Sequence, residues 1–268
     1  MKRECFTIIE VIVVIAIIAL LMAILVPVLR SSRLQVRTVI CSSNIRQLQL
    51  GLSEYESENK TFPFGFEDIS NKTNPLPPGS YAGNKYDKIG RWWFNFIEGL
   101  YQKSRNIRTV LQCPSKPMDD ISIGSNILWC NYGVNRSVCK SYDDMSPLRE
   151  EFVGKPLSSA SIPHPGQTLL ITDSGYSLIS WWHATNVPPV TLGNKIIEDA
   201  AYVPGLKINK ERQLWPGQEG DAIYGRHPNK TANVGYADGH TDIIKADELF
   251  VEKTANSYRN KSPLWQPK

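Results

Sequence analysis

The chain lacks the motifs that carry most enzyme chemistry. It has only four histidines among 268 residues. None lies in an HExxH helix, and the sequence contains neither a nucleophile elbow nor a glycine loop that could cradle phosphate. Segments 173–175 and 238–240 together hold Ser, His and Asp, but no spacing requires them to act as a set. We therefore expect a protein that is not an enzyme.

An excess of charge of one sign is also missing. The sequence has 30 Lys and Arg against 26 Asp and Glu, a net charge of +4. Spread over this length, that charge creates no concentrated basic field. Nucleic acid is therefore not expected as a partner.

One long apolar run lies near the N-terminus. From Val11 to Leu29 there are 19 consecutive residues without a charge, rich in Ile, Val, Leu and Ala. As a helix with a rise of about 1.5 Å per residue, the run would be roughly 28 Å long, close to the ~30 Å hydrocarbon core of a bilayer. It is apolar on every face, unlike a core helix, and longer than the roughly 7–15-residue core of a cleaved signal peptide. The sequence predicts one membrane-spanning helix.

Charged residues flank this run on both sides. Glu10 lies at its edge, where an unneutralised carboxylate is costly, so a positively charged partner is implied. Two basic residues precede the run and three follow it closely: Lys2, Arg3, Arg30, Arg33 and Arg37. By the positive-inside rule alone, the C-terminal flank would stay in the cytoplasm.

The N-terminal segment resembles the precursors of type IV pilins and pseudopilins. These have a short basic leader, a cleavage site directly before Phe and a Glu at the fifth mature position, which Phe6-Thr7-Ile8-Ile9-Glu10 matches. Pro27 falls where such helices commonly carry a proline, and Cys5 stands where the family usually has Gly. The resemblance implies that a prepilin peptidase cuts after Cys5 and methylates the Phe6 amine. It also implies that Glu10 meets that amine on a neighbouring subunit, and that the head lies outside the inner membrane.

Beyond the apolar run, helical periodicity continues on one face. Apolar residues recur at spacings of three, four and seven: Leu34, Cys41, Ile45, Leu48, Leu52 and Tyr55. We expect an α+β fold in which one long helix has a membrane-spanning first half and an amphipathic second half packed on a small antiparallel-sheet head, as in pilins. Its parts would be a leader (1–5), a membrane and assembly helix (6–29), an amphipathic continuation (30–58) and a globular head (59–268), with a bend or local loosening near Pro27.

The head sequence reads as short strands separated by turn residues. We expect strands at 109–112, 128–132, 168–172, 176–180, 232–236 and 241–244. Asp238-Gly239 favours a hairpin between the last two, and short helices are expected near 92–101 and 247–252. The aromatic cluster Trp92-Trp93-Phe94 could stack on a sugar, but such clusters more often fill a core.

Several head segments resemble a large pseudopilin-like family of planctomycete-type bacteria. That family combines a prepilin-type N-terminus with a C-terminal His…Asp-Gly motif. The matching segments are 41–48, 113–115, 131–135, 165–173 and 226–240. Here ten residues separate His227 from Asp238, about one more than the family pattern.

The cysteines fit an exported head. If Cys5 leaves with the leader, an even number remains, which allows two disulfides in three connectivities. Two of the cysteines lie in segments that recur in the resembling family, which favours Cys41–Cys113 together with Cys130–Cys139. Free buried thiols are the alternative. A zinc site is disfavoured because the spacing lacks a Cys-x-x-Cys pair.

The C-terminal motif contains a candidate metal site. His227, Asp238 and His240 could offer two imidazoles and a carboxylate to an ion such as zinc. Calcium, which some pseudopilins bind in the head, is poorly served by imidazole. In the alternative that we favour, the residues are structural: Asp238-Gly239 forms the turn and His227 bonds to the adjoining loop. No cofactor is then expected.

These observations predict a structural subunit of a pilus or a type II secretion pseudopilus. The resemblance implies as partners other pilin or pseudopilin subunits, a prepilin peptidase, an assembly ATPase and an inner-membrane platform protein. The protein would cross the inner membrane once, with its head on the periplasmic or extracellular side, before entering a filament. The alternative is a membrane-tethered surface protein whose head captures extracellular glycan through its aromatic residues.

Overall fold

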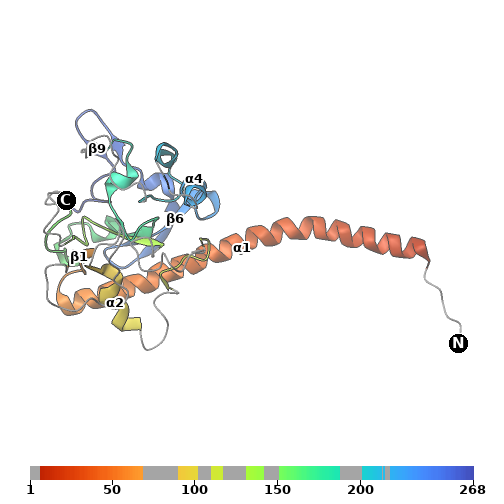
Figure 1. The fold of residues 1–268 in the computed structure, drawn as a ribbon, viewed down its shortest axis with the longest axis horizontal. Helices are drawn as coiled ribbons and strands as arrows, with labels where there is room; N and C mark the ends of the chain where they lie inside the picture. The colour runs from red at the N-terminus through yellow and green to blue at the C-terminus, as the bar shows by residue number, and fades with distance from the viewer. Residues whose placement is uncertain are drawn as a thin grey trace.

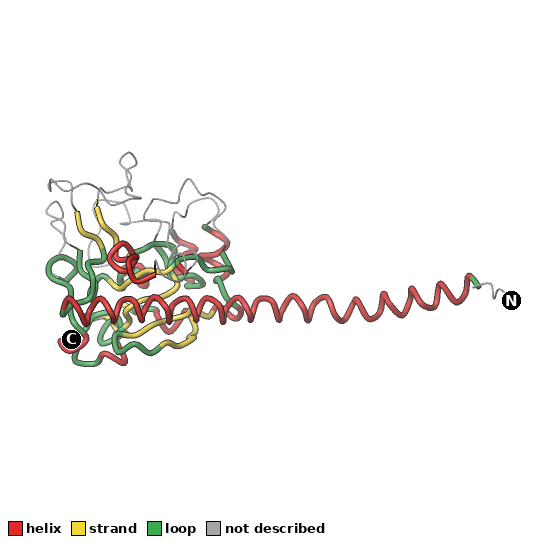
Figure 2. The backbone as a smooth tube through the Cα atoms, turned by 90° about the horizontal axis from the view of Figure 1, so that it is seen from below, coloured by secondary structure: helices red, strands yellow, loops and turns green. Residues whose placement is uncertain are grey.

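The fold is a single long helix attached to a small α+β head (Figure 1). The computed structural model describes residues 7–68, 90–101, 110–116, 131–141, 151–187, 201–212, 214 and 218–268. Helix α1 (Ile8–Asn59) projects far beyond the head with its N-terminal part, while its C-terminal part lies along the head (Figures 1 and 2). A long N-terminal apolar helix joined to a small sheet is, in general shape, pilin-like.

Both ends of α1 are defined by local hydrogen bonds. At the start, the Glu10 amide donates to Thr7 Oγ1 at 3.4 Å and the Thr7 amide donates to Glu10 Oε2 at 2.7 Å, which is a capping box. At the end, Lys60 adopts a left-handed conformation (φ 64°) and its amide donates to the Glu56 carbonyl. Pro27 lies inside the helix, which stays continuous and curves gently instead of loosening there (Figure 1).

The head is built on one five-stranded sheet. The strand order is β5-β3-β4-β6-β7, with β3 (Tyr132–Asn135), β4 (Leu169–Asp173), β5 (Leu178–Ile179), β6 (Thr231–Tyr236) and β7 (Thr241–Lys245). Strands β6 and β7 form the predicted hairpin, and Gly239 takes the positive φ of 96° that its turn needs.

The sheet is mixed, so the expectation of a purely antiparallel sheet is wrong in one place. The chain leaving β4 does not return beside it as a hairpin. Residues 174–177 carry it across β3, so that β5 pairs with β3 in parallel. The Gly175 amide, which donates to the Tyr202 carbonyl, fixes this crossing to another segment of the head.

Smaller elements surround the sheet. Two further pairs of short strands are β1 (Phe66–Asp68) with β2 (Gly90–Trp92), and β8 (Glu252–Lys253) with β9 (Tyr258–Arg259). The short α-helices are α2 (Trp93–Tyr101) and α4 (Glu219–Tyr224). Single 3₁₀ turns occur at Ser159–Ser161, Pro165–Gln167, Trp181–Ala184, Lys207–Glu211, Pro228–Lys230 and Ala246–Leu249.

Two local predictions differ from the structure. Residues 110–112 form no strand, because the amide of Cys113 and the carbonyls of Leu111 and Gln112 bond to side-chain and backbone groups outside any sheet. The closing helix predicted at 247–252 is a short 3₁₀ turn followed by β8. Of the strand predicted at 128–132, residues 128–130 lie outside the described residues.

The C-terminal part of α1 forms one side of the core. The apolar stripe of the sequence faces the sheet, and Cys41, Ile45, Leu48 and Leu52 are fully buried. The aromatic cluster at the start of α2 is buried with them, since Trp92, Trp93 and Phe94 are at most 7% exposed. These rings pack in the core, as the sequence favoured, and offer no open platform for a sugar.

Candidate functional site

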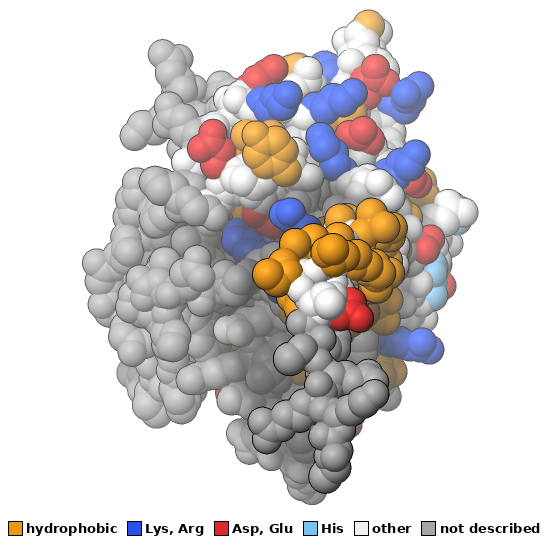
Figure 3. Space-filling view, turned by 90° about the vertical axis from the view of Figure 1, so that its right-hand side faces the viewer, with side chains coloured by type: hydrophobic (Ala, Val, Ile, Leu, Met, Phe, Trp, Pro, Cys, Tyr) orange, Lys and Arg blue, Asp and Glu red, His pale blue; other side chains and the backbone are white. Residues whose placement is uncertain are grey.

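The most unusual surface of the protein is the projecting part of α1. Every residue from 8 to 37, which we call the free half, is exposed, and the first buried residue of the helix is Thr38. Seen from its N-terminal end, the free half shows apolar side chains over the part of the helix that is in view, whereas the head above it carries mixed charge (Figure 3). The described residues contain one helix that is long and apolar enough to cross a membrane, and that helix is α1.

The residues predicted for processing and assembly lie on or next to this free half. Cys5 and Phe6 lie outside the described residues. Glu10 is exposed and turns back toward the helix start, where its carboxylate accepts from the Thr7 amide and hydroxyl, both at 2.7 Å. Pro27 lies in the exposed apolar segment. The hydrogen bonds between Glu10 and the N-cap residue Thr7 therefore hold the Glu10 side chain at the N-terminal end of the free half.

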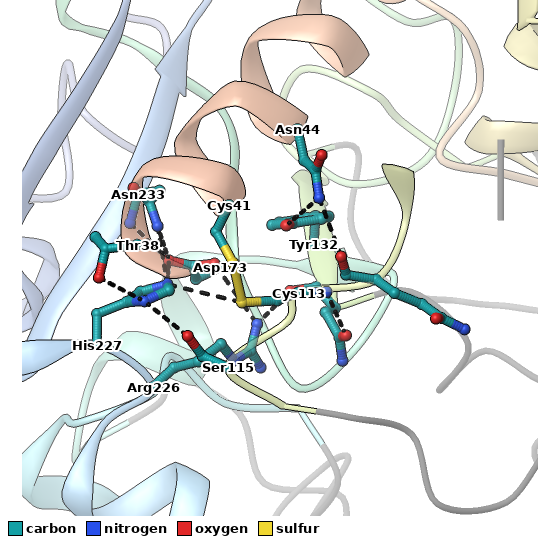
Figure 4. Close-up of a disulfide and its surroundings, with 12 residues drawn as sticks. Thr38, Cys41, Asn44, Cys113, Ser115, Tyr132, Asp173, Arg226, His227 and Asn233 are labelled. Atoms are coloured by element: carbon teal, nitrogen blue, oxygen red, sulfur yellow. Dashed lines mark hydrogen bonds and ion pairs between the residues drawn. A yellow bond between two sulfur atoms is a disulfide. The ribbon is translucent and has the colours of Figure 1, made fainter. Parts of the chain in front are cut away.

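The head is fastened to α1 by a disulfide between Cys41 and Cys113 (Figure 4). This is one of the two bonds that the resemblance implied. It joins residues 72 positions apart, and closing such a loop in the unfolded chain stabilises the fold by about 4 kcal/mol in the chain-entropy model.

The second expected disulfide is not formed. Cys139 carries a free thiol, fully buried in the core, and burial raises the pKa of that thiol. Its proposed partner, Cys130, lies outside the described residues. Cys139 is therefore an apolar packing residue here, which was the alternative considered for the cysteines.

The three candidate metal ligands of the C-terminal motif do not come together. Asp238 and His240 meet at the exposed hairpin, with Asp238 Oδ1 2.6 Å from His240 Nδ1. His227 precedes β6, whose six residues span roughly 20 Å, and lies among different partners inside the head. The predicted metal site is therefore not formed. Asp238 and His240 belong to an exposed turn, and His227 belongs to a separate buried cluster.

His227 is the centre of that buried cluster, next to the disulfide (Figure 4). Its Nε2 lies 3.1 Å from Asp173 Oδ2 and 2.8 Å from Asn233 Nδ2. Its Nδ1 lies 3.3 Å from Thr38 Oγ1 and 3.4 Å from Ser115 Oγ. The imidazole therefore connects α1, the loop that carries Cys113, β4 and β6.

Arg226 extends the cluster and carries its positive charge. Its side chain is fully buried, donates to both carboxylate oxygens of Asp221 and lies 3.6 Å from Asp173. It also donates to the carbonyls of Asn131 and Ser174. These bonds place the guanidinium where the loop before β6 meets the ends of β3 and β4.

The buried charges change one another's pKa values. Burial alone would raise the pKa of Asp173, but the neighbouring His227 and Arg226 lower it below its ordinary value. Burial also acts to raise the pKa of Asp221, yet Arg226 and Lys116 bring it down to about 2. Both carboxylates are therefore ionised at neutral pH.

Lys116 and Tyr202 complete the cluster on one side. Lys116 Nζ donates to the Tyr202 hydroxyl at 2.7 Å, and that hydroxyl donates to Asp221 at 2.9 Å. Burial lowers the pKa of Lys116 to about 8 and raises the pKa of Tyr202. An ion-pair network of this kind holds the segments of the head together. Within the described residues, Asp173 Oδ1 and Asn233 Oδ1 are the buried oxygens of this cluster that no hydrogen bond reaches.

Sequence reasoning found part of this cluster. Asp173, Arg226 and Asn233 lie in segments that carry the family resemblance, but the sequence did not predict a buried ion-pair role for them. Thr38, Lys116, Tyr202 and Asp221 carried no signal. Ser174, considered with Asp173 as part of a Ser, His and Asp set, is instead used locally, because its hydroxyl accepts from the Tyr176 amide.

Metal-ligating side chains do approach one another at the disulfide. Cys41, Cys113 and His227 bring one ligand atom each within 4.8 Å of the others.

Comparison of this chain with family models, with curated proteins and with solved structures finds no match. Function is therefore argued from the geometry and from the sequence motifs.

Proposed function

We propose that the protein is a pilin-like subunit, processed by a prepilin peptidase after Cys5 and assembled through α1 into a pilus or a secretion pseudopilus. The observation that carries this proposal is the free half of α1, whose uncharged, apolar stretch from Val11 to Leu29 no part of the described head covers. Exposed apolar surface of this extent marks an interaction with lipid or with other proteins.

The same rod suits two environments in succession. In the membrane, the uncharged stretch from Val11 to Leu29 matches the hydrocarbon thickness. In a filament, the rods of neighbouring copies would replace the lipid, since apolar helices bury one another's surface equally well. The polar, disulfide-fastened head would then coat the outside.

Glu10 would guide the docking of one subunit onto the next. Its carboxylate at the end of the rod would be neutralised in lipid by the methylated Phe6 amine of a neighbouring copy, as the resemblance implies. An assembly ATPase and an inner-membrane platform protein, which are implied partners, would lift subunits out of the membrane. The head would face the periplasm.

The alternative function, glycan capture by a membrane-tethered head, has less support. Trp92, Trp93 and Phe94, which suggested it, are buried. Their stacking faces are occupied by other core rings, such as Phe66 against Trp92 at 4.5 Å between centroids.

The substitution Glu10→Gln tests the proposal. Glutamine also serves at this position of a capping box, so the helix start is retained while the charge is removed. If the lost ion pair contributes about 1.4 kcal/mol or more, the amount of filament should fall by about tenfold or more. Membrane insertion and the folded head should not change.

The matched control is Glu58→Gln, another exposed carboxylate on the same helix but near its other end. It should assemble like the unmodified protein. Filament yield is measured by shearing cells and quantifying the protein released, with the membrane fraction as reference. Equal filament yield for the two variants would contradict the role of Glu10. Binding of the isolated head to a glycan array would favour the alternative function.

A further inference from the structure

We propose that Cys41, Cys113 and His227 bind zinc when the Cys41–Cys113 disulfide is reduced, and that the Asp173 side chain turns toward the ion as the fourth ligand. The disulfide in the oxidised protein and the metal in the reduced protein would each link α1 to the loop that carries Cys113. The inference is independent of filament assembly, because every residue that carries it lies in the head or in the docked part of α1.

The first argument is the spacing of the ligand atoms. Cys113 Sγ lies 3.9 Å from His227 Nε2, and all three Cys and His ligand atoms lie within 4.8 Å of one another. In a tetrahedral zinc site, bonds of about 2.3 Å to sulfur and 2.0 Å to nitrogen place sulfur and nitrogen about 3.5 Å apart and two sulfurs about 3.8 Å apart. Reduction leaves two sulfurs close to an imidazole nitrogen at nearly the required separation.

The second argument is a fourth ligand. Asp173 is fully buried, and its Oδ2 lies 3.1 Å from His227 Nε2. Within the described part of the chain, no hydrogen bond reaches its other oxygen, Oδ1, whose nearest ion-pair partner is Arg226 at 3.6 Å. A buried carboxylate oxygen without a donor is available to a cation. The two sulfurs and the nitrogen already lie together, and the Asp173 carboxylate, beside the nitrogen, would turn toward the ion to complete a tetrahedral set.

The third argument is the orientation of the imidazole. Nε2 lies on the side of Cys113 Sγ, where a metal would take the place of its present partner, Asn233 Nδ2 at 2.8 Å. On the other side of the ring, Nδ1 lies 3.3 Å from Thr38 Oγ1 and 3.4 Å from Ser115 Oγ (Figure 4). A metal-bound histidine usually donates its other ring N–H to such an oxygen, which fixes the tautomer and aims the ligating nitrogen. The second shell that a zinc histidine needs is therefore already present.

The fourth argument is charge. Two thiolates, Asp173 and Asp221 bring four negative charges, which a zinc ion, the Arg226 guanidinium and the Lys116 ammonium balance. The exposed side of the cluster is the loop after Cys113, where Ser115 and Lys116 are partly exposed. The site is thus neutral when filled and lies close to solvent.

The chemistry balances as follows. A phosphine reductant breaks the S–S bond, takes up an oxygen atom from water to become a phosphine oxide, and leaves Cys41 and Cys113 as two thiols. Zinc then binds the thiolates and releases their two protons, without changing its own oxidation state. Oxidation by a disulfide oxidant would expel the metal and restore the Cys41–Cys113 bond.

The experiment uses the full chain in detergent micelles, in a background where Cys5, Cys130 and Cys139 are replaced by Ser. Cobalt(II) is added as a spectroscopic substitute for zinc, before and after reduction with the phosphine. We expect one cobalt per reduced chain, with a thiolate-to-cobalt charge-transfer band and the visible bands of tetrahedral cobalt, and displacement by zinc. The oxidised chain should show none of these bands.

Two variants separate this site from adventitious binding. Cys113→Ser should abolish the charge-transfer band, and His227→Gln should weaken cobalt binding by at least about tenfold. His240→Gln, which changes an exposed histidine outside the cluster, should have no effect. Circular dichroism of each sample checks that the head is folded.

The proposal is overturned if the oxidised chain binds cobalt equally well, if the reduced chain binds none, or if Cys113→Ser binds like the parent. The comparison of oxidised and reduced parent needs no substitution in the site, so it stands even if a variant fails to fold. Normal filament assembly with no metal binding would refute this inference alone.

Discussion

Removing the charge of Asp173 should destabilise the head strongly, because this carboxylate lies at the centre of the buried cluster. It is fully buried, accepts from the amide and the side chain of Asn233 at 2.6 and 3.0 Å, and faces both His227 and Arg226. Asp173→Asn keeps the shape but leaves the positive charge of Arg226 with Asp221 as its remaining carboxylate. Breaking a buried ion pair in this way costs about 3–5 kcal/mol. Because Asp221 still pairs with Arg226, we expect about 3 kcal/mol.

The matched control is Asp238→Asn. Asp238 pairs with His240 at the exposed β6–β7 turn, and Asn-Gly serves that turn as well as Asp-Gly does. An exposed pair of this kind is worth less than about 1 kcal/mol. Urea unfolding of the full chain in micelles, followed by tryptophan fluorescence, measures both variants, since Trp93, Trp181 and Trp265 are buried in the head. Equal midpoints for the two variants would refute the assignment of Asp173 as the central charge of the head.

Two further perturbations test the fold. Gly235→Ala should lower the free energy of unfolding by about 1–3 kcal/mol, because a Cβ there would lie 2.5 Å from the Gln49 side chain where α1 crosses β6. The control Gly220→Ala, which has open space around the added Cβ, should be neutral or slightly stabilising in the same urea assay. The pKa of Asp221, which is lowered to about 2, predicts stability that is present above about pH 4 and lost as the pH falls toward 2, about 2 kcal/mol in all. In Asp221→Asn this part of the acid dependence should disappear, and an unchanged profile would contradict it.

The sequence was informative where a feature is periodic or local. Helix α1 follows from the uncharged run and from the apolar stripe that ends near Tyr55, and the β6–β7 hairpin follows from Asp238-Gly239. The burial of the aromatic cluster was also predictable, because large rings gain most from leaving water. Such signals depend on neighbours a few residues apart.

The assembly of the buried cluster could not be predicted because its partners are distant in the chain. Asp173 and His227 are brought together only when β4 and β6 pair, and Lys116 meets Asp221 across the head. No local rule marks those residues among the other charged positions of the chain. The parallel pairing of β5 with β3 was missed for a similar reason, since a short strand after a short loop favours a hairpin.

The central claim is that the free half of α1 is retained in the mature protein and links one copy to the next. Intact-mass analysis of the protein recovered from sheared filaments tests it most directly. We predict a chain that begins at a methylated Phe6 and still contains the uncharged stretch through Leu29. A recovered protein that begins after Leu29, or one found only as a single copy in the membrane with Met1 in place, would contradict the account.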